Sequence, residues 1–189
     1  MKLTFESDLQ YQHDAIKSIT ALFEGQPLAD SINEYSFVRE AGVLNFINGI
    51  GNNLVLSEEQ ILKNLQAVQF ESEIKLSSEL DGMNFSVEME TGTGKTYVYL
   101  RTIYELFAQY GFKKFVIVVP SIAIREGVLK NLVITHDHFQ NLYDNCPIHF
   151  QVYDSTKVSA LRGFASGNTI EILVINIDSF AKDENIIDN

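Results

Sequence analysis

The residues best suited to chemistry lie in one glycine-rich stretch, Met89-Glu90-Thr91-Gly92-Thr93-Gly94-Lys95-Thr96. Glycines permit the tight turns that let several backbone N–H groups point inward at a chain of phosphates. Lys95 can place a positive charge on the β- and γ-phosphates, and the Thr96 hydroxyl can ligand Mg²⁺. The stretch therefore predicts a loop that binds a nucleoside triphosphate and Mg²⁺, with Lys95 and Thr96 in catalytic roles. The residues expected to hold the cofactor are Thr91, Gly92, Thr93, Gly94, Lys95 and Thr96.

The first position of this loop departs from the general pattern G-x-x-x-x-G-K-[ST], because Met89 stands where that pattern has glycine. A glycine-rich turn between a strand and a helix is the alternative interpretation. The context favours a phosphate site, since Phe85, Val87 and Met89 alternate as in a strand before the loop. After it, apolar residues recur at helical spacing as far as Tyr110, and Gly111 ends the predicted helix. The N-terminal dipole of that helix would face the phosphates.

Strands and helices are predicted to alternate after the loop. Lys114–Val119 is an unbroken apolar and β-branched run, which predicts a strand buried on both faces. Further strands are predicted at His149–Tyr153 and Ile170–Ile177. One helix is predicted to begin at Ser121, and another to cover Thr156–Ala165. Together with the strand before the loop, this order predicts an α/β fold with a doubly wound parallel sheet.

Two domains are expected, an N-terminal helical extension over residues 1–83 and the α/β domain over residues 84–189. Asp8 is suited to cap the first helix of the extension. Ser57 opens a second helix, and Gln60, three residues later, completes a capping-box pattern. The role of the rest of the extension does not follow from the sequence.

The net charge of −11 is placed unevenly along the chain. Residues 1–90 contain 5 Lys and Arg against 15 Asp and Glu, whereas residues 91–189 contain 9 against 10. Such an acidic balance argues against a protein that coats nucleic acid non-specifically. Any DNA contact is therefore expected in the second half of the chain or in parts of the protein outside this sequence.

The sequence contains neither a membrane helix nor a signal peptide, since no stretch approaches the roughly 20 apolar residues that a span needs. We therefore expect a cytoplasmic protein without membrane contact. The single cysteine, Cys146, is expected to be a part-buried filler rather than a catalytic thiol. His136-Asp137-His138 could suggest a metal site, but both histidines share a side only in an extended segment, so a surface turn is preferred.

Several segments resemble a known family of motor proteins. A T-G-x-G-K-T loop with a relaxed first glycine is common in helicase-like motors of superfamily 2. More closely, Met89–Ile103, Lys114–Val128 and Ile175–Phe180 resemble the restriction subunits of type III restriction–modification enzymes. The resemblance implies a RecA-like ATPase domain that uses ATP and Mg²⁺ to move on duplex DNA, with a nuclease further along. It also implies a methyltransferase partner that reads the recognition sequence.

The same resemblance suggests particular contacts to nucleic acid and to the base of ATP. Ser121 and Arg125 match a motif that grips a backbone phosphate, and Ser179 lies in a segment similar to a second such motif. Ser121 could equally be a plain helix cap, and Arg125 a solvated helix residue. Leu9–Ile16 resembles the glutamine-motif helix of these motors. Gln12 could hydrogen-bond the adenine edge and select ATP over GTP, unless it is merely an exposed helix residue.

A complete motor would need parts that this sequence lacks. An acidic pair after a later strand should hold Mg²⁺, and a second domain should supply an arginine finger. Asp183-Glu184 lies in a polar tail and is not assigned to that role. The chain is therefore expected to be an N-terminal fragment that binds ATP without turning it over. The alternatives are a different superfamily 2 helicase, acting on DNA or RNA, and a non-catalytic nucleotide-binding module.

Overall fold

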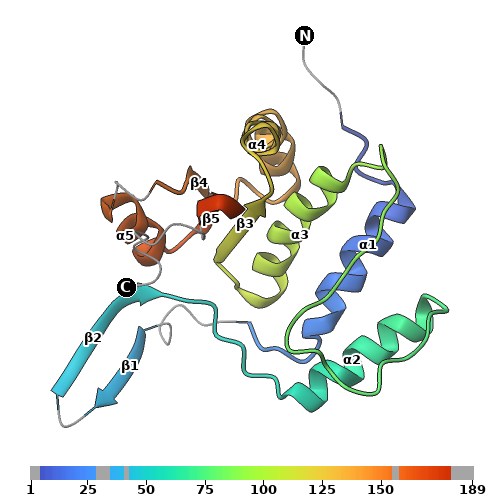
Figure 1. Cartoon of the computed structure of the whole chain (residues 1–189), viewed down its shortest axis with the longest axis horizontal. Coiled ribbons are helices and arrows are strands. Elements are labelled where there is room, and N and C mark those ends of the chain that lie inside the picture. Colours follow the sequence, from blue (N-terminus) through green and yellow to red (C-terminus); the bar gives the residue numbers. More distant parts are fainter. Residues whose placement is uncertain (1–4, 29–34, 41–42, 155–157, 180–189) are drawn as a thin grey trace. The chain divides into compact units, whose positions relative to one another are not determined.

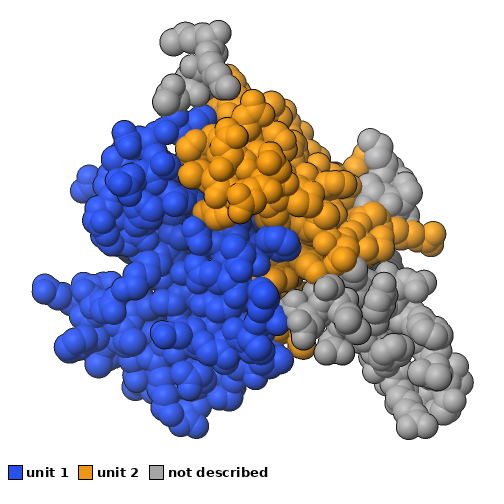
Figure 2. All heavy atoms as spheres, turned by 180° about the vertical axis from the view of Figure 1, so that it is seen from behind, with its two compact units in different colours: residues 1–28, 54–110 blue, residues 29–53, 111–189 orange. Residues whose placement is uncertain are grey.

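Helices make up one part of the chain and a parallel sheet the core of the other (Figure 1). The computed structural model describes residues 5–28, 35–40, 43–154 and 158–179. The chain divides into two compact units, which Figure 2 draws in different colours. Unit 1 comprises residues 1–28 and 54–110, and unit 2 comprises residues 29–53 and 111–189. The domain boundary expected between residues 83 and 84 follows motifs rather than contacts and stays a prediction.

The described part of unit 1 is helical. It contains α1 (Gln10–Thr20), a 3-10 turn η1 (Ala21–Phe23), α2 (Glu58–Glu71) and α3 (Lys95–Tyr110). Helix α1 packs against α3, and α2 packs against η1. Each of these elements contributes buried apolar side chains, which include Ile16, Leu22, Ile61, Leu100 and Ile103. Burial of such side chains is the main stabilising term for helices of this length.

The helix starts in unit 1 are partly as expected. Ser57 caps α2, because its side chain accepts a hydrogen bond from the Gln60 backbone N–H at 3.3 Å. The Gln60 side chain donates to Asn64 at 2.9 Å instead of returning to the cap residue, so the capping box is incomplete. The cap predicted at Asp8 is wrong. Leu9 occupies the N-cap position without a side-chain hydrogen bond, which leaves Asp8 one residue too early to cap α1.

A buried asparagine of α2 forms hydrogen bonds with η1 and the residue that follows it. Asn64 is 8% exposed, and its Nδ2 donates to the carbonyl oxygens of Leu22 and Glu24, both at 2.9 Å. A buried amide must find such partners, because an unpaired one would cost about 1–3 kcal/mol. Asn64 therefore fixes how α2 sits on η1.

Unit 2 is built on three described parallel strands in the order β3-β5-β4. They are β3 (Lys114–Val119), β4 (Ile148–Val152) and β5 (Ile170–Asn176), and they are joined by α4 (Ile122–Leu142) and by α5 (Val158–Ser166). Helix α4 packs against β3 and β5, and α5 against β5. The central strand, β5, is buried from its first residue to Ile175, as a strand covered on both faces should be. The predicted α/β class, with a RecA-like parallel sheet and flanking helices, is confirmed.

Two expectations about the sheet are wrong. Phe85–Met89 form no strand, because none of the described strands pairs with them and a strand exists only through its ladder of hydrogen bonds. Strand β3 is not buried on both faces, since Val116 and Val118 are 50% and 49% exposed. These two residues are two positions apart and therefore share one face of β3, so one face of this strand is open. The apolar pattern thus located the strand at Lys114–Val119 but not its neighbours.

An antiparallel pair that the sequence did not predict belongs to unit 2. Strand β1 (Tyr35–Glu40) pairs with β2 (Val43–Ile50), and β2 contacts α5. Just after β2, the Oδ1 atom of Asn52 accepts hydrogen bonds from the backbone N–H groups of Lys113 and Lys114, at 2.7 and 2.9 Å. Asn52 therefore ties the chain after β2 to the beginning of β3.

Helix α4 extends well beyond its predicted start and absorbs the histidine pair. His136 and His138 lie inside the helix rather than in a turn. Two residues apart on a helix, they are rotated by about 200° about its axis and so point to nearly opposite sides, which separates them as metal ligands. Among the described residues no three His, Cys, Asp or Glu side chains gather where they could hold a metal ion. No helix in this part of the chain is long and apolar enough to cross a membrane.

Candidate nucleotide-binding site

The glycine-rich loop runs directly into α3, whose first residue is Lys95. Gly92 and Gly94 have φ angles of 84° and 87°, in the left-handed region where a Cβ atom causes strain. The carbonyl of Gly94 accepts the backbone hydrogen bond of Val98 at 3.0 Å, which begins the helical ladder. The loop therefore wraps around the N-terminus of α3, where free N–H groups and the helix dipole favour an anion.

The lysine of the loop is held by neutral acceptors. Lys95 Nζ donates to the carbonyl oxygens of Met89 at 2.5 Å and Glu90 at 2.7 Å. The hydroxyl of Thr93 also donates to the Glu90 carbonyl, at 2.7 Å. A phosphate is a stronger partner for an ammonium group than a carbonyl is, because the hydrogen bond is then assisted by charge on both sides. Lys95 is thus placed to exchange these carbonyls for a phosphate.

Gln12 of α1 lies against this loop. Its side chain is buried, with the residue 6% exposed, and its Nε2 donates to the Thr93 carbonyl at 2.9 Å. A Cβ atom added to Gly94 would come within 2.7 Å of that nitrogen, so only glycine leaves room for the amide. The alternative that Gln12 is an exposed helix residue is therefore wrong. Two segments 81 positions apart in the sequence meet at this amide.

The oxygen of the Gln12 amide has no hydrogen-bond donor among the described residues. Gln12 Oε1 is buried and accepts no hydrogen bond from any residue that the structure describes. The orientation of the amide follows from its partner, since the Thr93 carbonyl can only accept and so requires the nitrogen. A buried acceptor without a donor costs about 1–3 kcal/mol. This open acceptor beside a phosphate-type loop is the property expected of a site that awaits a ligand carrying a donor.

The remaining residues of the predicted nucleotide site are less enclosed. Thr96 is half-buried in the first turn of α3 and hydrogen-bonds with Tyr99, a residue whose pKa is raised by burial. Thr91 is exposed at the tip of the loop. The geometry brings Gln12, Thr93, Gly94 and Lys95 together, while the metal-binding role of Thr96 stays a prediction.

The three residues expected to contact nucleic acid lie at one edge of the sheet in unit 2. Val119 and Asn176, the last residues of β3 and β5, are paired in register, so the segments that follow them leave the same edge. Ser121 caps α4 by accepting from a backbone N–H at 3.3 Å, and Ser179 closes the 3-10 turn η2 (Ile177–Ser179) after β5. Arg125 forms an ion pair with Glu126 at 2.9 Å. The structure shows Ser121 as a helix cap, and the contacts of all three residues with DNA phosphates stay predictions.

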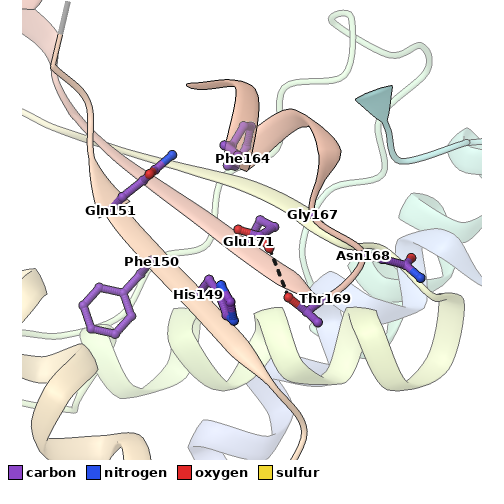
Figure 3. A pocket seen from close by; sticks show the side chains of 9 residues that line it. His149, Phe150, Gln151, Phe164, Gly167, Asn168, Thr169 and Glu171 are labelled. Carbon is purple, nitrogen blue, oxygen red and sulfur yellow. Dashed lines mark hydrogen bonds between the residues drawn. The ribbon is translucent and has the colours of Figure 1, made fainter. Parts of the chain in front are cut away.

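A cavity of about 390 Å³ lies near the opposite edge of this sheet, towards the amino ends of β4 and β5 (Figure 3). Its lining comes from β4, from α5, from the turn before β5 and from the beginning of β5, and includes Phe150, Phe164 and Glu171. Glu171 is 8% exposed and accepts a hydrogen bond from the Thr169 hydroxyl at 3.0 Å. Its carboxylate is therefore already partnered inside the protein. Among the described residues that line this cavity, there is neither a glycine-rich loop nor an unpartnered buried atom.

Cys146 is partly buried, as expected. Burial raises the pKa of its thiol, which disfavours the reactive thiolate. This agrees with a filler rather than a nucleophile.

Two residues of α3 that contact the α1 segment were not predicted from the sequence. Arg101 of α3 donates through Nη1 to the carbonyl of Ser7 at 2.6 Å, and the Tyr110 hydroxyl donates to the carbonyl of Thr20 at 3.0 Å. The acceptors are backbone atoms about 90 positions earlier in the chain. Such contacts leave no trace in residue type or spacing, because any residue supplies the same carbonyl.

The loop, the helix that it opens and the parallel sheet define a P-loop protein with a RecA-like fold. Residues 7–189 match the family described as "Type III restriction enzyme, res subunit", which is nearly the whole chain. The chain therefore belongs to the family of type III restriction enzyme Res subunits.

The chain is also similar to individual proteins that are named as Res subunits of type III enzymes. The StyLTI Res subunit of Salmonella typhimurium is 41% identical over 114 residues, which is 51% of this chain and 11% of that protein. The EcoPI Res subunit of Escherichia phage P1 is 30% identical over 146 residues, or 75% of this chain and 14% of that protein. A third Res subunit, from Escherichia coli, is 38% identical over 95 residues. The matched part thus spans only about a tenth to a seventh of the length of these relatives.

Proposed function

We propose that this chain is the ATP-binding part of a type III restriction enzyme subunit. The observation that carries the proposal is the open, buried acceptor of Gln12 beside the glycine-rich loop. A loop of this kind accounts for binding of phosphates, and an adjacent amide with free capacity accounts for selection of a base. The family membership supports a restriction subunit over another superfamily 2 helicase.

Lys95 would supply the charge that the phosphates need. Its ammonium group would leave the carbonyls of Met89 and Glu90 and donate to the β- and γ-phosphates. The backbone N–H groups of the loop, from Thr91 to Gly94, would donate to the same phosphates at the N-terminus of α3. ATP supplies the phosphoanhydride bond, and these residues would bind and orient it.

Gln12 would read the base. An amide nitrogen carries two hydrogens, and the Thr93 carbonyl uses one of them, so one donor and the unpartnered Oε1 acceptor remain. Adenine offers a matching pair, an amino donor and a ring-nitrogen acceptor on one edge. Guanine carries a carbonyl where adenine has its amino group and would leave Oε1 facing another acceptor. Gln12 would therefore favour ATP over GTP.

Thr96 would be the protein ligand for Mg²⁺. Its hydroxyl belongs to the first turn of α3, next to the lysine, and oxygen ligands are the ones that Mg²⁺ prefers. The hydrogen bond with Tyr99 would orient the Thr96 side chain. The acidic residues that complete a magnesium site in such motors are not among the residues assigned in this chain.

The activity of the whole protein extends the proposal. The similar proteins are named as Res subunits of type III restriction–modification enzymes. By that likeness, the complete subunit would hydrolyse ATP to move on duplex DNA, cleave it with a nuclease located elsewhere, and depend on a methyltransferase subunit for recognition. Ser121, Arg125 and Ser179 would contact the DNA backbone, a role supported by the common sheet edge from which their segments leave.

Lys95→Ala tests the nucleotide site. We expect the variant to bind a fluorescent ATP analogue at least about tenfold more weakly than the parent chain, because a charge-assisted contact contributes about 1.5–3 kcal/mol. Equal affinity of the two proteins would overturn the proposed site. Lys130→Ala, which removes an exposed lysine from α4, is the matched control and should bind as the parent does.

Turnover provides a second test of the same proposal. The 189-residue chain should bind ATP without sustained phosphate release, with or without duplex DNA, because it lacks an assigned acidic pair and arginine finger. Sustained, DNA-stimulated phosphate release would contradict this. In the complete subunit, Lys95→Ala should abolish DNA cleavage, and unchanged cleavage would contradict the restriction assignment.

A further inference from the structure

Helix α3 holds α1 at both of its ends. Arg101 donates to the carbonyl of Ser7, which lies just before α1, and Tyr110 donates to the carbonyl of Thr20, the last residue of α1. Both donors are side chains of α3. Both acceptors are backbone carbonyls, one just before α1 and the other at its last residue. A pair of such bonds fixes the position of α1 along α3 independently of the side chains that α1 carries.

These two bonds are shielded from water. The Arg101 side chain is 12% exposed and Tyr110 is 9% exposed. Aromatic contacts close both ends of the α1–α3 contact, since the Phe5 ring stacks on Tyr97 at 6.2 Å and the Phe23 ring packs on Tyr110 at 6.1 Å between centroids. Hydrogen bonds in such a low-dielectric setting are stronger and more directional than those in water.

The register of α1 decides what the glycine-rich loop meets. A slip of one residue would turn the helix by about 100° and move it by about 1.5 Å along its axis. Tyr11 or His13 would then replace Gln12 at Thr93, and neither could place an amide there. The apolar contacts of Ile16 and its neighbours cannot prevent such a slip alone, because burial of apolar surface is non-directional.

We propose that Arg101 and Tyr110 are positioning residues for nucleotide specificity: they hold α1 in the register at which Gln12 presents its free acceptor beside the phosphate loop. The inference rests on the proposed function, since it concerns the base-reading half of the same site. Neither residue has a place in the phosphate loop. Selection of adenine therefore depends on two side chains further along α3, at its middle and its last residue.

Tyr110→Phe is the most direct test, because it removes one hydroxyl and keeps the ring. Competition binding to the full 189-residue chain would give the affinities of ATP, GTP and inorganic tripolyphosphate. We expect the ratio of ATP to GTP affinity to fall by about three- to tenfold, the size of one hydrogen bond, with tripolyphosphate affinity unchanged. Arg101→Met, which keeps an unbranched apolar stem, should act in the same direction.

The controls separate positioning from general damage. Gln109→Ala removes an exposed hydrogen bond within α3, to Glu105 at 3.0 Å, and should leave all three affinities unchanged. In a Gln12→Ala background, Tyr110→Phe should no longer alter the ratio, because the residue acts through Gln12. An unchanged ratio in Tyr110→Phe and Arg101→Met, or an equal loss for all three ligands, would overturn the inference.

The same experiment distinguishes failure of the inference from failure of the proposed function. If Gln12→Ala lowers the ratio while Tyr110→Phe and Arg101→Met do not, the positioning role is wrong and the nucleotide site stands. If Lys95→Ala leaves all three affinities unchanged, the nucleotide site itself is wrong and the inference fails with it.

Discussion

Two glycines, one in each unit, make room for a buried polar side chain, and the two arrangements end differently. A Cβ atom on Gly94 would lie 2.7 Å from the Gln12 amide nitrogen, and one on Gly167 would lie 2.0 Å from a carboxylate oxygen of Glu171. Glu171 accepts a hydrogen bond from Thr169, whereas Gln12 retains a buried oxygen without a donor.

The difference distinguishes a completed structural contact from the arrangement that we propose binds nucleotide. Around Glu171 the protein supplies the partner, so the cavity in Figure 3 needs no ligand to complete its hydrogen bonding. Around Gln12 the protein supplies an acceptor for the amide nitrogen but no donor for the amide oxygen among the described residues. Buried polar groups are nearly always partnered in folded proteins. The unpartnered oxygen of Gln12 lies beside the glycine-rich loop, and this combination supports the proposed nucleotide site.

Gly94→Ala should have the largest effect of the substitutions that test this comparison. The left-handed backbone and the clash with Gln12 should together reduce the free energy of unfolding by about 2–3 kcal/mol, and nucleotide affinity should fall more than tenfold. Urea unfolding and competition binding would measure the two effects. Gly92→Ala is the control, because it has the same backbone strain but open space at the Cβ position, so it should destabilise less.

A Gln12→Ala background sharpens that test. With the amide removed, Gly94→Ala should cost no more than Gly92→Ala does, since only the backbone strain remains. A difference that persists without Gln12 would mean that the amide is not what requires glycine at position 94.

Gly167→Ala should destabilise the chain by a smaller amount, about 1–2 kcal/mol, because Glu171 must be displaced from its hydrogen bond. Gly163→Ala is the matched control from the same cavity. It lies within α5 with nothing near the added Cβ, so it should be neutral or stabilise by up to about 1 kcal/mol. Neither substitution should change nucleotide affinity. A loss of ATP binding in Gly167→Ala, measured on folded protein, would contradict the structural assignment of this cavity.

Alkaline pH should produce the smallest effect and should act through α3. Burial raises the pKa of Tyr97, Tyr99 and Tyr110 above that of a free tyrosine. A raised pKa in the folded state means that this stability is fully present below the unfolded value, near 10, and is lost as the pH rises through the folded value. Urea midpoints should therefore fall above about pH 10, and less steeply in Tyr110→Phe. A midpoint that does not change over this range would contradict the buried setting of these tyrosines.

Much of the fold followed from local pattern. The run Lys114–Val119 coincides with β3. Ser121 caps the beginning of α4, and Gly111 follows the last residue of α3. Both helix ends were predictable because turns and caps depend on neighbouring residues. The strand expected at Phe85–Met89 was wrong, because a strand needs a neighbour to pair with. The double burial of β3 was also wrong, because burial depends on what packs over each face of the strand. Residues 35–50 gave no usable pattern for the β1–β2 pair.

Residue types and motifs in the sequence also predicted part of the candidate site, but not its long-range contacts. The residue types of the loop predict a phosphate site, and the motif around Gln12 identified a helix that contacts this loop. Its burial, and its contact with a loop 81 positions away, could not be deduced from spacing. Arg101 and Tyr110 were invisible to the sequence analysis, because they act on backbone carbonyls rather than on recognisable side chains.

The most direct test of the central claim is the affinity of the chain for ATP and GTP, measured by titration calorimetry with Mg²⁺ before and after Gln12→Ala. The open acceptor predicts that the parent binds ATP at least about tenfold more tightly than GTP, the value of a good pair of hydrogen bonds. Gln12→Ala should bring the two affinities close together by weakening ATP alone. Equal affinities in the parent, or a preference for ATP that survives the substitution, would contradict the assignment of Gln12 as the residue that reads the base.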